Sequence, residues 1–170
     1  VNPERTELGD TAALRKMQSG VQTLALAWYF TGKEEYAAHA AGLLRTWFLD
    51  GKTGMTPHLK FAQAIPGRCK GRHIGIVDTN GWPTLIDAVI LLRGSAAWTD
   101  GDDKALQAWF GQFLKWLTTS RFGKQEGRYH NNHSTQYDVQ VATYALYVGR
   151  EKLARKVVEA AKTKHIAGHI

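Results

Sequence analysis

The sequence holds a single cysteine and four prolines in 170 residues, and its apolar residues never form a long uninterrupted run. One cysteine, Cys69, cannot build a disulfide framework or a thiolate metal cluster, so we interpret it as a small buried hydrophobe. The longest apolar stretch, Leu85 to Leu92, is interrupted by Asp87 and is too short to span a membrane. These absences exclude a disulfide framework and a membrane-spanning helix within residues 1–170.

The first residues carry no signal-peptide pattern, and the chain begins with Val1 instead of an initiator methionine. The sequence is therefore typical of a processed protein or an excised piece, and its first residues indicate no compartment. With 44% hydrophobic and 22% charged residues, we expect residues 1–170 to form one soluble globular domain with a substantial core.

Basic residues outnumber acidic ones by 22 to 15, which gives a net charge of +7 with neutral histidines and a pI of about 9.6. Such a charge attracts nucleic acid, acidic polysaccharide and anionic membrane surfaces alike. No recognised nucleic-acid-binding motif accompanies the cations and tryptophans, so a nucleic-acid-binding helical repeat ranks below an anionic polysaccharide partner. Neither a nucleic-acid partner nor a membrane partner is predicted, and the oligomeric state is left open.

Apolar residues recur at helical spacing through most of the chain, and strand patterns are nearly absent. This spacing predicts an all-α fold of six helices in three antiparallel hairpins. The expected helices cover residues 10–31, 33–50, 79–98, 99–120, 132–148 and 151–165. Gly32 and the pair Asp50-Gly51 are expected helix stops. A weak repeat between 29–37 and 147–154 favours hairpins stacked in an arc, with their loops gathered in a cleft.

Two clusters of side chains could suggest a metal site. The acidic residues Asp100, Asp102 and Asp103 lack the rest of an EF-hand loop, so we interpret them as a helix cap rather than a calcium site. The histidines at 130 and 133 could combine with His165 and His169, but no acidic ligand accompanies them. Scattered surface histidines are the better interpretation, and neither a metal nor a cofactor is predicted.

The segment from Gly51 to Asp78 has no helical period and carries many glycines and prolines. Long structureless connections inside compact domains are often functional. Seven polar residues stand out in this one, and four of them are permanent cations: His58, Lys60, Gln63, Arg68, Lys70, Arg72 and His73. The segment therefore predicts a wall that binds anions, with a merely solvated basic loop as the alternative.

The densest chemistry lies between Arg128 and Asp138, where amides, imidazoles and phenols precede and open a predicted helix. Such a run offers hydrogen-bond donors, acceptors and proton carriers together. Tyr137, Gln140 and Tyr144 follow His133 by four, seven and eleven residues, so all four share one helix face. That face either lines a cleft or is satisfied by hydrogen bonds inside a helical core.

Several of these stretches together resemble the alginate lyase superfamily of polysaccharide lyases, and the similarity spans most of the chain. The resemblance rests on the segments 131–134 (Asn-Asn-His-Ser), 61–67 (Phe-Ala-Gln-Ala-Ile-Pro-Gly), 71–79 (Gly-Arg-His-Ile-Gly-Ile-Val-Asp-Thr) and 137–140 (Tyr-Asp-Val-Gln). It implies part of an α/α toroid, incomplete at both ends, that cleaves uronic-acid polymers such as alginate or glucuronan by β-elimination, generally outside the cytoplasm. A general acid, a Tyr with an Arg nearby, is implied in a later segment.

Elimination begins with removal of the proton on carbon 5 of a uronate, which is barely acidic until the adjacent carboxylate is neutralised. Amide donors at a helix N-terminus suit that task, and we assign it to Asn132. The same helix end disfavours a protonated imidazole, so His133 is the candidate base. Asn131 is assigned as helix cap or binder.

The remaining predicted substrate-binding residues are Gln63, Arg68, Arg72, Tyr137 and Gln140. The general acid is left unassigned, although Tyr129, Tyr137 and Tyr144 are possible local donors. A binding module that holds an acidic polysaccharide without cleaving it is the main alternative function.

Overall fold

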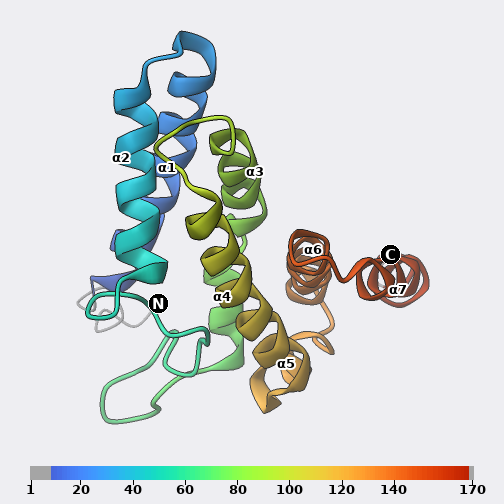
Figure 1. Ribbon diagram of the computed structural model, residues 1–170. Helices are drawn as coiled ribbons and strands as arrows, with labels where there is room; N and C mark the ends of the chain where they lie inside the picture. Colours follow the sequence, from blue (N-terminus) through green and yellow to red (C-terminus); the bar gives the residue numbers. More distant parts are fainter. Residues whose placement is uncertain (1–8, 169–170) are drawn as a thin grey trace. The chain divides into compact units, whose positions relative to one another are not determined.

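The computed structural model describes residues 9–168, and the regular elements within this range are all helical (Figure 1). They are α1 (Asp10–Thr31), α2 (Glu34–Leu44), the π-helical turn η2 (Arg45–Leu49), the 3-10 helix η3 (His73–Thr79), α3 (Trp82–Leu92), α4 (Asp100–Thr119), α5 (Arg121–Glu126), α6 (Asn132–Tyr147), α7 (Glu151–Ala161) and the π-helical turn η4 (Lys162–Ile166). An isolated bridge pairs Ile65 with Cys69. The predicted all-α class is confirmed, and no helix in this range could cross a membrane.

The described chain divides into two compact units that alternate along the sequence. The hairpin unit comprises Gly9–Thr56 and Gly81–Trp109, and the site unit comprises Pro57–Asn80 and residues 110–168. Helix α4 contributes its first part to the hairpin unit and its second part to the site unit. Both units contain fully buried apolar side chains.

Helices α1 and α2 form the first predicted hairpin, and they lie side by side in Figure 1. Gly32 ends α1 in the left-handed conformation with φ of 67°, and its N–H donates to the Trp28 carbonyl at 2.7 Å. A glycine takes this φ without steric cost, which confirms the expected stop. After η2, the Asp50 carboxylate accepts from the backbone N–H groups of Lys52 and Thr53, so the second stop is confirmed as well.

An aromatic cluster fills the core of the hairpin unit. The rings of Phe48, Trp82 and Trp109 meet edge to face, with centroids 4.8 to 5.6 Å apart. This arrangement is favourable for aromatic pairs beyond the area they bury. The Trp109 indole N–H is also satisfied, because it donates to the Met55 carbonyl at 2.7 Å.

The start of α4 is capped as the sequence predicts. Thr99 and Asp102 exchange hydrogen bonds: the Asp102 N–H donates to Thr99 Oγ1 at 3.1 Å, and the Thr99 N–H donates to Asp102 Oδ2 at 3.0 Å. The Arg45 guanidinium donates to both Asp102 oxygens, from Nε at 2.8 Å and from an Nη at 2.6 Å. The Arg45 guanidinium, assisted by donors of Thr99, holds the pKa of Asp102 well below its usual 3.8.

Replacing Asp102 with Ala should lower the free energy of unfolding by about 1–2 kcal/mol, because the helix cap and the two bonds from Arg45 are lost together. Because the pKa of Asp102 is lower in the folded protein than in the unfolded one, its ionised form stabilises the fold at pH values above the unfolded pKa of 3.8. The difference in stability between wild type and the variant should therefore shrink as the pH falls below 3.8. Urea unfolding at several pH values measures both effects. Asp100→Ala, at an exposed position of the same first turn, is the control; an equal loss in both variants would contradict the prediction.

Three segments differ from the sequence prediction. The helix expected over 79–98 begins at Trp82 and ends at Leu92, because a turn follows in which the Ser95 hydroxyl donates to Glu34 and accepts from the Ala97 N–H. Residues 73–79 form the 3-10 helix η3 instead of loop and helix start. The connection expected over 121–130 contains a further short helix, α5.

Candidate active site

Helix α5 and the connection after it position the central acidic group of the site unit. The Ser120 hydroxyl caps α5 by accepting from the Gly123 N–H at 3.0 Å, which starts a helix at Arg121. Glu126 is the last residue of α5, and its side chain is only 1% exposed. A carboxylate so deeply buried requires hydrogen-bonding partners.

Two histidines supply those partners. His73, the first residue of η3, places Nδ1 2.9 Å from Glu126 Oε2. His133, in the first turn of α6, places Nδ1 2.6 Å from Glu126 Oε1. Each carboxylate oxygen therefore faces one imidazole, and the imidazoles remain 24% and 21% exposed.

The carboxylate fixes how these imidazoles carry their protons. An ionised carboxylate only accepts hydrogen bonds, so with Glu126 ionised both rings hold a proton on Nδ1. Nε2 is then the nitrogen with a free lone pair on each neutral ring. A histidine held in this form by a buried carboxylate is suited to general-base chemistry.

Tyr129 forms a wall beside the two histidines. Its ring centroid lies 5.2 Å from that of His73 and 5.6 Å from that of His133. The Tyr129 N–H donates to the Glu126 carbonyl at 3.1 Å, which ties this wall to the end of α5. The side chain is 41% exposed, so it can meet a ligand that approaches the imidazoles.

The paired amides at the start of α6 have different positions. Asn131 is the N-cap, and its Oδ1 accepts from the His133 N–H at 2.8 Å. Asn132 is the first residue of the helix and is exposed. The cap holds His133 in place, and the Asn132 amide makes no hydrogen bond to a residue between 9 and 168, so it can face a substrate.

Gln140 lies in the core of the site unit. It is completely buried, its Oε1 accepts from the Thr79 hydroxyl at 2.8 Å, and its Nε2 donates to the Ile76 carbonyl at 3.4 Å. The Tyr144 hydroxyl also donates to Gln140 Oε1, at 3.3 Å. The prediction that Gln140 contacts substrate does not fit this burial; the residue instead fixes η3, and with it His73, against α6.

Tyr137 is likewise used inside the unit. Its hydroxyl donates to the Leu117 carbonyl at 3.0 Å, and Gly127 packs against its ring. Burial, with a smaller effect of the Asp138 charge, raises the pKa of Tyr137 to about 12. Predicted substrate binding by Tyr137 therefore does not fit its contacts, and the same holds for its possible role as proton donor.

The loop from Pro57 to Arg72 holds Gln63 and Arg72 together. Gln63 has φ of 51°, an uncommon backbone conformation for a residue with a side chain, and its Nε2 donates to Asp78 Oδ1 at 3.0 Å. Arg72 donates to the Gln63 carbonyl at 3.0 Å and to Gln63 Oε1 at 3.3 Å. Residues held in such conformations cluster at functional sites, and here the strained residue lies against the arginine that precedes His73.

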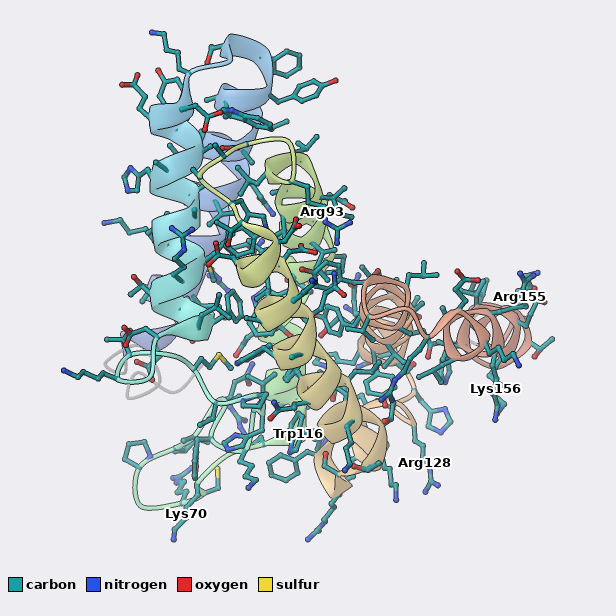
Figure 2. All side chains as sticks on the ribbon, viewed as in Figure 1. Lys70, Arg93, Trp116, Arg128, Arg155 and Lys156 are labelled. Carbon is teal, nitrogen blue, oxygen red and sulfur yellow. The ribbon has the colours of Figure 1, made fainter. Side chains whose placement is uncertain are left out.

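Arg68 lies apart from this contact pair, on an exposed turn formed by residues 65–68. Gly67 has φ of 72°, as the third position of a Pro-Gly type II turn requires. Lys70, two residues after Arg68, extends outward from the loop in Figure 2. The predicted anion-binding wall thus separates into a fixed arginine, Arg72, and exposed cations that include Arg68 and Lys70.

Close backbone contacts fix the end of this loop next to His73. A Cβ on Gly71 would lie 1.9 Å from the Lys60 carbonyl oxygen, and one on Gly75 would lie 2.6 Å from the Ala62 Cβ. Neither position has room for a side chain. The segment that carries His73 is therefore packed directly against the segment that carries Gln63.

Glu126 is the residue that sequence reasoning missed. Its only signal was an acidic residue seven positions before His133, in a stretch interpreted as a connection. Residues 9–168 contain no group of three or more side chains placed to hold a metal ion, such as the one weighed for the histidines. His165 pairs with Asp138 instead, and His169 lies outside the described residues.

Comparisons with known proteins identify the family of this chain. A family profile described as alginate lyase matches residues 1–170. The crystal structure of an alginate lyase from Bacteroides ovatus is similar with a TM-score of 0.90 and 41% sequence identity, over 99% of this chain and 45% of that one. The chain thus spans less than half the length of that relative, and no curated protein matches it. Its helical hairpins are part of an α/α toroid, and the chain belongs to the alginate lyase family.

Proposed function

We propose that the protein is a polysaccharide lyase that cleaves a uronic-acid polymer, alginate or a glucuronan-like chain, by β-elimination. The observation that carries this proposal is the buried Glu126 carboxylate shared by the Nδ1 atoms of His73 and His133. It supplies an oriented base whose Nε2 lone pair is free. Family membership is consistent with this reaction.

In the proposed reaction His133 Nε2 takes the proton from carbon 5 of a uronate unit. The electrons of that C–H bond form the double bond between carbons 4 and 5, and the bond from carbon 4 to the glycosidic oxygen breaks. The leaving oxygen needs a proton from a general acid, which we leave unassigned. Of the three tyrosines considered, Tyr137 and Tyr144 donate hydrogen bonds inside the site unit, whereas Tyr129 is exposed beside His133.

Charge moves onto the carboxylate oxygens of the uronate as the proton leaves. We assign their stabilisation to the exposed Asn132 amide at the first position of α6. The helix dipole favours negative charge at the same place. Arg72 and Arg68 are proposed to bind the flanking anionic units, and Gln63 is proposed to act with Arg72, which it contacts.

The test is to incubate the full chain with alginate, polyglucuronate and hyaluronate and to follow the ultraviolet absorbance of the unsaturated product. We expect turnover of at least one uronan, at a rate that prior treatment with a chelator does not change. Binding without turnover would instead support a polysaccharide-binding module. Preference for nucleic acid over every uronan would contradict both functions.

We also propose that the protein acts outside the cytoplasm, in the periplasm or after secretion, because a long anionic polymer does not cross a membrane. Cell fractionation followed by immunodetection tests the location. Finding the protein in the cytoplasmic fraction alone would contradict it.

A further inference from the structure

A second concave region adjoins the histidine pair within the site unit. It is an open pocket of about 600 Å³. Its lining comes from the connection between α5 and α6, from α6, and from the end of α7 with η4: Gly127, Arg128, Tyr129, His130, Asp138, Ala160, Lys164 and His165. A volume of this size suits a small ligand or one part of a polymer.

Tyr129 joins this pocket to the proposed active site. Its ring lies against both His73 and His133, and the same residue lines the pocket. A chain bound at His133 can therefore continue past Tyr129 into the pocket. The residues of the pocket have no role in the elimination as described above.

The pocket combines two exposed cations with one largely buried carboxylate. Arg128 and Lys164 are exposed, and neither forms a direct ion pair with a residue between 9 and 168. Asp138 is 14% exposed, and its Oδ2 lies 2.5 Å from His165 Nδ1. Burial raises the pKa of Asp138, opposed by the hydrogen bond from His165 and by the charges of His165 and Lys164.

This combination selects among anions. Two cations attract a carboxylate, and an arginine can bind it through two parallel hydrogen bonds. The Asp138 carboxylate disfavours a multiply charged phosphate but accepts hydrogen bonds from hydroxyl groups. A ligand with one carboxylate and several hydroxyls fits both requirements, whereas a nucleic acid offers repeated phosphates.

We infer that this pocket is a subsite for a uronate unit beyond the one that His133 deprotonates, with Arg128 and Lys164 binding its carboxylate and the Asp138–His165 pair binding its hydroxyls. This inference rests on the proposed function. It gives the end of α5 and the connection after it complementary roles, since Glu126 orients the base and Arg128, two residues later, holds the polymer. The subsite contributes to substrate binding and leaves the chemical step unchanged.

Steady-state kinetics of the full chain on the uronan it cleaves test the subsite. Arg128→Ala and Lys164→Ala should each raise KM about tenfold, the loss of one charge-assisted contact, with kcat within about twofold of wild type. Arg128→Lys should restore part of the loss. On the shortest oligosaccharide cleaved, which leaves the pocket empty, neither variant should differ from wild type.

Arg155→Ala is the matched control, because Arg155 is an exposed cation of α7 that does not line the pocket. Figure 2 shows Arg128 and Lys156 extending toward the same side of the view and Arg155 lying on the opposite side of α7. A rise in KM no larger than that of Arg155→Ala would overturn the inference. So would a fall in kcat with unchanged KM, because that result assigns the residues to chemistry or folding.

Calorimetry separates this inference from the proposed reaction. Should wild type cleave no uronan, its binding of alginate or glucuronan oligosaccharides is measured and compared with Arg128→Ala. Weaker binding by the variant alone would support the subsite while the lyase proposal fails. No oligosaccharide binding by wild type, or equal binding by Arg128→Ala and Arg155→Ala, would overturn the subsite.

Discussion

Replacing Glu126 with Gln should lower kcat on a uronan by about 10²–10⁴-fold, the range associated with general-base catalysis and its orienting carboxylate. The carboxylate accepts from both His73 and His133, one at each oxygen. A glutamine offers one acceptor and one donor. Only one imidazole can then keep its proton on Nδ1, and the other must move that proton to Nε2 to accept from the amide.

The tautomer change gives this prediction a readout that a general loss of stability would not produce. Nitrogen chemical shifts of the two imidazoles should show Nδ1–H on both rings in wild type and on only one in Glu126→Gln. The variant should also lose about 1–3 kcal/mol of unfolding free energy, as for a buried polar group with a mismatched partner. Glu35→Gln, on the exposed surface of α2, is the control. Wild-type kcat with unchanged tautomers would contradict the assigned role of Glu126.

His133→Ala should lower kcat by about 10²–10⁴-fold. It should also lower the free energy of unfolding by about 1–3 kcal/mol, because one oxygen of the buried Glu126 carboxylate loses its partner. The imidazole is 21% exposed, and the helix cap uses the backbone N–H of residue 133, which alanine retains. The proton of carbon 5 would then have no base in position. Adding free imidazole to the variant should recover part of the activity, because a small base can occupy the vacated space.

His73→Ala is the discriminating companion, since the two histidines share one carboxylate. We expect a smaller fall in kcat than for His133→Ala, and no recovery with imidazole, if His73 serves to hold Glu126 and the substrate. The reverse order of effects would assign the base to His73. Thermal unfolding of both variants checks that the comparison is between folded proteins.

The local features of the fold were predictable from sequence because their causes are local. Gly32 stops α1 through its own φ, and Asp50 turns the chain through its own side chain. The start of α6 follows from the Asn131 cap in the same way. Such signals act within a few residues, so a single sequence contains them.

The site was less predictable because its contacts are distant in sequence. His73 and Glu126 are separated by 53 positions, and the contact depends on η3 packing beside α5. Helix α5 has six residues and contains Gly123, which is too short for an apolar period to emerge. Nothing near Glu126 in the sequence indicates that its side chain is buried.

Helical spacing correctly placed Gln140 and Tyr137 on one helix, but it did not predict that their side chains bond to other segments of the protein instead of contacting substrate. Both share a polar face with His133, and such a face can line a cleft or be satisfied inside a core. The hydrogen bond from the Thr79 hydroxyl satisfies Gln140 inside the core, and the Leu117 carbonyl accepts the hydrogen bond of the Tyr137 hydroxyl. Each partner lies on another segment of the chain, so spacing alone could not distinguish the two outcomes.

The shared carboxylate sets how charge is distributed during a turnover. With Glu126 ionised and both imidazoles neutral, the three side chains carry one negative charge at the outset. When His133 takes the substrate proton, imidazolium and carboxylate together become neutral, while the uronate gains electron density. The side chains of the protein therefore lose their net negative charge as the uronate acquires negative charge. Electrostatic repulsion between Glu126 and the reacting uronate is thus reduced as the proton is transferred.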